Sequence, residues 1–341
     1  MRTHRRLGTA LAVAVLVTAA STGTADAATT MTDLGFLPGA TEALARDVNT
    51  TGVVVGRSGG RSWSRAVRWG ARGGVTDLGV LPGGEHSTAT GVNGAGVAAG
   101  YSDGPDPTYR AVRFDASGVT DLGLVPGFSD SFGLGVDDAG AVVGEGWDRS
   151  TGNRRAVRWD GAGALTWFPL PAGYANSLLG GVAPNGVAAG SVFDGGLPER
   201  AVRWNLDGTA TVLPTLPRGG DARANGVNRY GQAVGYAFTG DGAQHAVRWS
   251  RDGTAIHDLG AATPYNSVAR AINESGLVVG TAQDTAGAFR PVRWDAGGAV
   301  LDLGVPTTTY TADAWAVNRY GVIVGASGWT GPNRALRWVV R

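Results

Sequence analysis

Short apolar runs separated by glycine-rich turns recur along almost the whole chain. In one unit the runs cover residues 89–93, 97–101, 110–114 and 119–123. Runs of this length that alternate with polar positions predict β-strands rather than helices. The Asp-Gly, Gly-Gly and Asn-x-x-Gly turns between them favour hairpins, because glycine reaches positive φ without a Cβ clash. Each unit is therefore predicted to hold four antiparallel strands.

The units repeat with a constant period. The third run carries the phrase Arg-Ala-Val-Arg-Trp at 65–69, and its last position recurs every 44 or 45 residues. That position is occupied by Trp69, Phe114, Trp159, Trp204, Trp249, Trp294 and Trp338. A glycine at the end of the second run recurs in step with it, at Gly56, Gly100, Gly144, Gly190, Gly235, Gly280 and Gly325. Seven units of four strands predict an all-β fold, with one propeller blade per repeat.

The two chain ends distinguish a closed propeller from an open β-solenoid. A lone fourth-strand phrase occupies residues 32–35, and the last unit stops after its third-strand phrase at 334–338. These pieces are complementary, and closure protects strand edges that would otherwise recruit other chains. We therefore predict a seven-bladed β-propeller of four-stranded antiparallel blades, with the N-terminal strand completing the last blade.

The repeated unit resembles the HAF family of bacterial extracellular repeats. The likeness rests on Asp-Leu-Gly-x-Leu-Pro-Gly, on Gly-Val-Asn-x-x-Gly-x-Val-Val-Gly and on (Arg/His)-Ala-Val-Arg-Trp, and it covers nearly all of the chain after residue 27. The chain departs from the family in the tripeptide that names it, to which His245-Ala246-Val247 comes nearest. Five units read Arg-Ala-(Val/Leu) instead, and one reads Arg-Pro-Val. The resemblance implies secretion and a repeated β fold, and it brings no catalytic residues.

The composition predicts the location of the protein and argues against some partners. Residues 1–27 combine an arginine-rich start, an apolar stretch and Ala-Asp-Ala, which predicts a secretory signal peptide cleaved after Ala27. We therefore expect a single domain of residues 28–341. This domain is expected to be extracellular and monomeric, without a membrane anchor. The chain contains no cysteine and carries a net charge of +1. Without a basic surface it gives no reason to expect nucleic acid as a partner.

The second arginine of the phrase needs a partner if it lies between blades, since an unpaired buried charge is costly. Folding the last hairpin places an aspartate within reach of this arginine in five units, whereas the other two carry Trp167 and Val212 in its place. We expect a structural ladder of arginine–aspartate pairs: Arg68–Asp77, Arg113–Asp121, Arg248–Asp258, Arg293–Asp302 and, after closure, Arg337–Asp33.

A localised function is expected where the repeat is least regular, on the face that carries the long loops. Trp63, Trp147 and Trp329 lie in those loops. A polar ring precedes the first strands, at Glu42, His86, Asp130, Asn176, Asp221, Asn266 and Thr311. If this ring faces the channel mouth, it could bind a polar ligand or a hard cation such as calcium. The competing explanation is a turn position that favours polar residues.

These observations leave three functions open. The chain contains none of the zinc-protease, serine-hydrolase or phosphate-loop motifs. We expect an extracellular binding module for a glycan or a protein. The alternatives are a carbohydrate-active hydrolase or lyase that uses loop carboxylates, and a structural cell-surface repeat without a discrete ligand.

Overall fold

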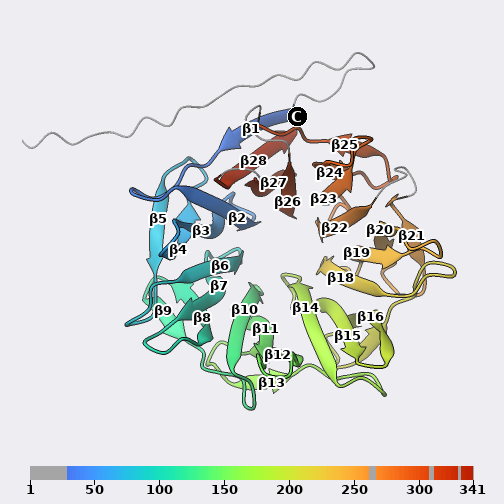
Figure 1. Ribbon diagram of the computed structural model, residues 1–341, viewed down its shortest axis with the longest axis horizontal. Coiled ribbons are helices and arrows are strands. Elements are labelled where there is room, and N and C mark those ends of the chain that lie inside the picture. The colour runs from blue at the N-terminus through green and yellow to red at the C-terminus, as the bar shows by residue number, and fades with distance from the viewer. Residues whose placement is uncertain (1–28, 261–265, 307–310, 329–331, 341) are drawn as a thin grey trace, which may run out of the picture.

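Seven four-stranded antiparallel sheets form a ring in the computed structural model (Figure 1). The structure describes residues 29–260, 266–306, 311–328 and 332–340, so the predicted signal peptide and Trp329 lie outside the described residues. No helix occurs in the described part of the chain. The prediction of a seven-bladed β-propeller is confirmed.

Each blade contributes one strand to every radial layer (Figure 1). The innermost strands are β2 (Glu42–Val48), β6 (Ser87–Val92), β10 (Asp130–Val136), β14 (Asn176–Val182), β18 (Ala222–Val227), β22 (Ser267–Ile272) and β26 (Ala312–Val317). The second strands are β3 (Val54–Gly59), β7 (Ala98–Asp103), β11 (Val142–Trp147), β15 (Ala188–Asp194), β19 (Ala233–Phe238), β23 (Val278–Gln283) and β27 (Val322–Ser327). The third strands are β4 (Ser64–Trp69), β8 (Tyr109–Asp115), β12 (Arg154–Trp159), β16 (Leu197–Trp204), β20 (Gln244–Trp249), β24 (Phe289–Trp294) and β28 (Arg334–Val340). The outermost strands are β5 (Val75–Gly79), β9 (Gly118–Asp121), β13 (Leu165–Trp167), β17 (Ala210–Val212), β21 (Ile256–Asp258), β25 (Val300–Asp302) and, from the start of the chain, β1 (Thr29–Asp33).

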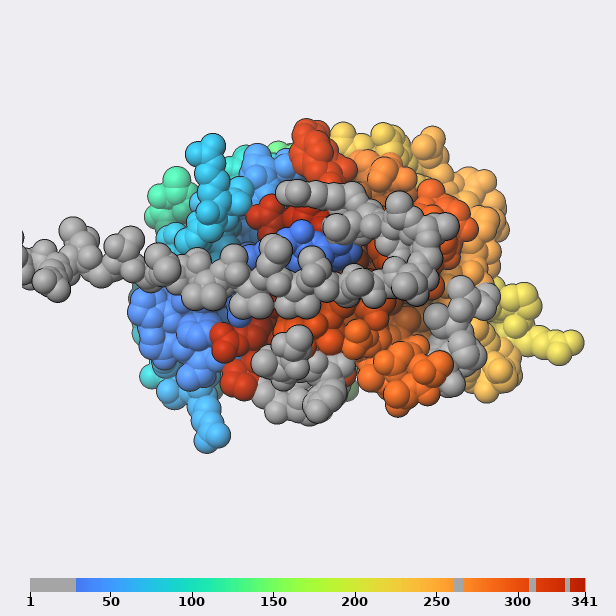
Figure 2. Space-filling view, turned by 90° about the horizontal axis from the view of Figure 1, so that it is seen from above, coloured from blue at the N-terminus to red at the C-terminus, as the bar shows by residue number. Residues whose placement is uncertain are grey.

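The N-terminal strand closes the ring as predicted. β1 pairs antiparallel with β28, from Thr29 opposite Val340 to Asp33 opposite Leu336. In the view from the closure side, blue N-terminal atoms lie among the red atoms of the last blade (Figure 2). The seventh blade therefore consists of both ends of the described chain.

Aromatic residues at the ends of the third strands pack between blades. Trp69 and its six equivalents are at most 1% exposed. In five of the six tryptophans the Nε1–H donates to a carbonyl about 35 residues earlier, as from Trp249 to Pro214 O at 2.7 Å. Burying each such ring stabilises the fold by about 1.5–3 kcal/mol, and the hydrogen bond satisfies the buried N–H.

Asparagines of the first turn join five of the seven blades to the next, whereas the third and fourth blades carry Asp137 and Ala183 at this position. The Asn49 Oδ1 accepts hydrogen bonds from Thr51 N and Val53 N, while its Nδ2 donates to Asn93 O at 3.0 Å. The same bond continues from Asn93 to Asp137 and returns from Asn318 to Asn49 O. This circle of amide bonds holds the blades together around the axis.

Every innermost strand contains a β-bulge. The pairing register shifts between Ala45 and Asp47, and at the equivalent point of all seven innermost strands. A bulge leaves one residue unpaired and re-aims its side chain. The extra residues are Arg46, Thr90, Leu134, Gly180, Asn225, Arg270 and Trp315.

Candidate functional site

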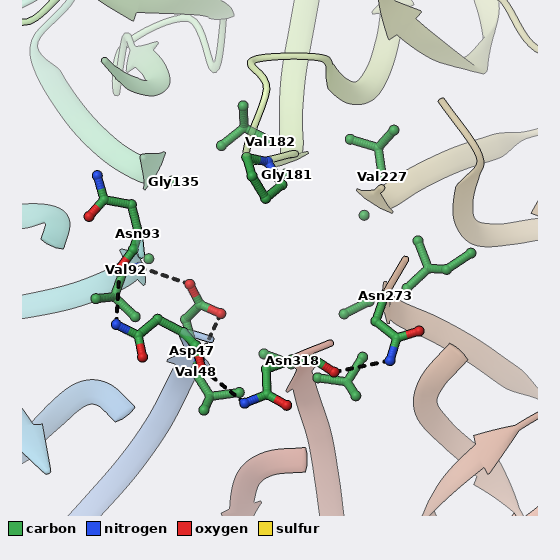
Figure 3. A pocket seen from close by; sticks show the side chains of 18 of the residues that line it. Asp47, Val48, Val92, Asn93, Gly135, Gly181, Val182, Val227, Asn273 and Asn318 are labelled. Carbon is green, nitrogen blue, oxygen red and sulfur yellow. Dashed lines mark hydrogen bonds between the residues drawn. The ribbon is translucent and has the colours of Figure 1, made fainter. Parts of the chain in front are cut away.

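The seven bulged residues meet in a cavity of about 540 Å³ on the ring axis. The cavity lies toward the face of the tight turns, because its rim includes Thr50, Asp138 and Glu274 from the first turns of three blades. Figure 3 shows this end, with Asn273 and Asn318 in the amide circle and Asp47 pointing inward. The cavity draws lining residues from all seven blades.

The cavity wall differs on its two sides. Next to the bulge stand glycines in four successive blades, at Gly91, Gly135, Gly181 and Gly226, and alanines in the following two. In the first blade Asp47 occupies this position. The glycines bring bare backbone to the cavity, whereas the sixth, seventh and first blades place large side chains there.

Those three neighbouring blades build one cluster, which we call the Arg–Trp–Arg cluster: Arg46, Trp315 and Arg270. The guanidinium carbon of Arg46 lies over the Trp315 ring, 4.4 Å from its centroid. That of Arg270 lies 4.7 Å from the same ring. Because the blades of these arginines flank the blade of Trp315, the indole holds both cations by cation–π contacts.

Two hydrogen-bond donors of the Arg–Trp–Arg cluster have no acceptor among the described residues. The Nε atoms of Arg46 and Arg270 are buried and lack a hydrogen-bond partner among the described residues. Burial lowers the pKa of both guanidinium groups, and the Asp313 carboxylate partly opposes this. Unpartnered polar atoms of this kind are costly to keep and call for an explanation.

Asp47 places a half-buried carboxylate on the same wall. Its Oδ2 accepts a hydrogen bond from Val92 N at 2.8 Å, and its Oδ1 accepts one from Val48 N at 2.7 Å. Burial raises its pKa to about 6 in spite of these bonds, because the surrounding blades displace most of its water. Asp47 therefore changes charge near neutral pH.

The predicted polar ring lies elsewhere. Its members do not line the axial cavity in the described structure. Instead they face the third strand of the preceding blade or the loop before it. Six of the seven side chains bond there, as Glu42–Asn333, His86–Ser64, Asp130–Tyr109, Asn176–Arg154, Asp221–Glu199 and Asn266–Gln244.

The physical reason lies in the start of the third strand. Its first backbone N–H has no strand partner and needs an acceptor. Asn176 Oδ1, for example, accepts Arg154 N at 3.0 Å. For Thr311, the hydrogen bond is made by its backbone carbonyl, from Gly328 N at 3.3 Å. A ligand-binding role for this ring stays a prediction, and these bonds already use much of its acceptor capacity.

The loop tryptophans also have structural neighbours. Trp147 packs near Phe132, with ring centroids 6.3 Å apart, and lies under Arg154, which pairs with Glu145 at 2.5 Å. Trp63 lies 6.0 Å from the guanidinium carbon of Arg65. Asp221 lines a second, open hollow of about 600 Å³ beside the β15–β16 hairpin. This hollow lies on the predicted loop face.

The expected arginine–aspartate partners need correction. The aspartates meet the first basic residue of the phrase rather than the second: Arg65–Asp77, Arg110–Asp121, His245–Asp258, Arg290–Asp302 and Arg334–Asp33. The pairings of Arg68, Arg113, Arg248, Arg293 and Arg337 with these aspartates are therefore wrong. In the observed register Asp77 stands opposite Val67, and Arg68 stands opposite Thr76. Since neighbouring residues of a strand face opposite sides, Asp77 shares the side of Arg65.

The second arginines join the next blade instead. Arg68 donates to Gly96 O at 2.8 Å, and Arg248 donates to Ala296 O at 3.1 Å. Arg158 differs, because it pairs at 2.5 Å with Asp137, the residue that replaces asparagine in the third blade. The expectation that these arginines are structural agrees with these contacts, although the acceptors are mostly turn carbonyls.

Neither a metal-binding cluster nor a membrane-spanning helix occurs among the described residues. No group of three histidine, aspartate or glutamate side chains lies close enough to hold a metal ion within the described ranges. No helix long and apolar enough to cross a membrane occurs in that part of the chain.

The sequence pattern did not predict the cavity, because β-bulges have no strong sequence signature. One signal was present. Six of the seven innermost strands carry glycine or alanine immediately before the bulge, as at Ala45, Ala89 and Gly133. The next position changes in every unit from arginine through glycine to tryptophan. Variation directly beside a repeated small residue marks this site.

No protein-family model matches the sequence, and comparison with curated proteins finds no match. Solved structures do match. Virginiamycin B lyase from Staphylococcus aureus is 13% identical with a TM-score of 0.56, over 92% of this chain and 100% of that chain. The β-propeller domain of the Trilobed protease from Pyrococcus furiosus is 12% identical with a TM-score of 0.60, over 88% of this chain and 94% of that chain. Similarity at these identities shows the fold alone, and it defines the class of this protein as a β-propeller.

Proposed function

We propose that the chain is a secreted, extracellular β-propeller that acts as a binding module and holds its ligand in the axial cavity. The supporting observation is the loss of sevenfold repetition at the bulge. The interblade tryptophans and arginines repeat almost unchanged, while the bulged residues differ from each blade to the next. A purely structural repeat has no need of such variation. A cavity of about 540 Å³ also falls within the ~300–1,000 Å³ of typical ligand sites.

The raised pKa of Asp47 favours a second candidate function, a carbohydrate-active hydrolase or lyase. A carboxyl whose pKa burial raises to about 6 suits general acid or base work. Both of its oxygens, however, accept backbone N–H bonds in the wall. Glycoside hydrolysis generally requires a second carboxylate. Of the two at the rim, Glu274 pairs with Arg229, and Asp138 accepts a hydrogen bond from Gly94 N at 3.4 Å. The arrangement therefore favours binding over catalysis.

The test is a screen of residues 28–341 against glycan and peptide arrays, with and without calcium. Mass spectrometry of the bound compounds would detect turnover. Trp315→Ala should abolish specific binding, and the matched loop variant Trp63→Ala should leave it unchanged. Loss with Trp63→Ala alone would move the site to the loop face. Turnover would establish the enzyme, and absence of all binding would support the structural repeat.

A further inference from the structure

Building on the proposed binding function, we infer that the axial cavity selects a small carboxylate-bearing ligand, which Arg46 and Arg270 bind. The carboxylate belongs either to a free hydroxy acid or to a uronate unit of a saccharide. Both sources present the same planar oxyanion to the Arg–Trp–Arg cluster.

The contacts with Trp315 leave the required donors available. The guanidinium carbons of Arg46 and Arg270 lie 4.4 Å and 4.7 Å from the centroid of the indole. The N–H groups lie in the plane of the guanidinium and match the two oxygens of a carboxylate. Neither Arg46 nor Arg270 donates a side-chain hydrogen bond within the described part of the chain. Thr90 and Asn225, at the same bulge, bond to backbone carbonyls of the neighbouring blade.

The charges around the cluster favour an anion. Asp313 attracts both guanidinium groups, whereas Arg57 adds repulsion at Arg46 and Arg223 adds repulsion at Arg270. Arg57 pairs with Glu42 at 3.2 Å. Asp47, the nearest carboxylate in sequence, directs both oxygens to backbone N–H groups. Arg46 and Arg270 thus share one carboxylate, and an anionic ligand would complete their pairing.

The opposite wall and the volume of the cavity limit the size of the ligand. Four successive glycines line this wall, and a Cβ at each would meet the next blade at 2.8–3.1 Å, so the innermost strands approach each other closely there. Close backbone approach is a common use of glycine in binding sites. The cavity volume of about 540 Å³ suits a ligand of one or two sugar units rather than a folded partner.

The test is calorimetric titration of residues 28–341 at low salt. The probes are galacturonate, digalacturonate, the neutral methyl ester of galacturonate and a tri-aspartate peptide. We expect the acids to bind at least tenfold more tightly than the ester. Arg46→Gln and Arg270→Gln should each weaken acid binding at least tenfold, and Arg46→Lys should weaken it less. Arg72→Gln, which removes an exposed arginine that does not line the cavity, should change it less than twofold. Thermal unfolding checks that each variant folds.

The outcomes separate the two proposals. If galacturonate and digalacturonate both bind, the ligand is a free acid. If only digalacturonate binds, the ligand is a uronate unit of a saccharide. Binding of neutral sugars that Trp315→Ala abolishes but the glutamine variants leave unchanged would overturn the carboxylate assignment and keep the binding module. Binding of the tri-aspartate peptide alone would also overturn that assignment. If no probe binds and both arrays are silent, the proposed function fails as well.

Discussion

Single residues at one repeat position play different roles in different blades. The second arginine of the phrase bonds to a turn carbonyl in one blade, as Arg248 does, and to a carboxylate in another, as Arg158 does. The difference follows from Asp137, which is 1% exposed and replaces the asparagine of the amide circle. A chain with internal repeats therefore supplies its own matched controls for single substitutions.

Arg158→Ala is expected to destabilise the fold more than Arg248→Ala. The first change leaves the buried Asp137 carboxylate unpaired, which costs about 3–5 kcal/mol when a buried pair is broken. Because Arg158 is partly exposed, we expect the lower end of that range. The second removes one hydrogen bond to a carbonyl, worth about 1 kcal/mol. Denaturant unfolding of both variants measures the difference, and equal losses would contradict the role given to Asp137.

Asp47 should make stability depend on pH in a defined window. Burial raises its pKa from 3.8 to about 6, so between these values the folded chain keeps a proton that the unfolded chain releases. The free energy of unfolding then falls as pH rises, by up to about 3 kcal/mol from this group. Asp47→Asn should lack this contribution. Its stability relative to the natural chain should therefore improve between pH 4 and pH 7.

A second aspartate provides the control for this pH dependence. Asp207 is exposed, and hydrogen bonds from Thr209 hold the pKa of its carboxyl below the usual value. The stability difference for Asp207→Asn should be small and of opposite sign over the same range of pH. An Asp47→Asn difference that stays constant with pH would contradict the account of Asp47.

Among the elements, β1 closes the ring. It covers the outer edge of β28, whose Trp338 is fully buried. A chain lacking residues 1–33 should expose that edge and lose soluble, folded protein relative to a chain that begins at residue 28. A synthetic peptide of residues 28–35 should restore folding, measured by circular dichroism and sedimentation. Unchanged stability without β1 would show that closure adds nothing.

The strands could be predicted from the sequence, and the side-chain partners could not. Blade number and closure follow from the recurrence of Trp69 and from the complementary chain ends, signals that survive small errors in register. The Arg68–Asp77 pairing failed because a shift of one residue in a hairpin moves a side chain to the other face. The cavity was missed because the bulge at Arg46 interrupts the alternation on which strand patterns depend.

For the whole molecule, function is expected where the symmetry breaks. The repeated phrase is basic, aromatic and present in every blade, yet its tryptophans are buried and its arginines bond between blades. Net charge is +1 over the entire chain, but two arginines converge on one cavity. Whole-chain composition therefore gives no indication of the ligand class, which depends on the local charge inside the ring.

The most direct measurement is a crystal structure of residues 28–341 grown with the tightest-binding probe. The account predicts electron density for the ligand on the ring axis, with oxygens within hydrogen-bond distance of Arg46 and Arg270 and with Trp315 still between them. Density on the loop face, beside Trp63 or in the hollow at Asp221, with an empty axial cavity, would contradict it.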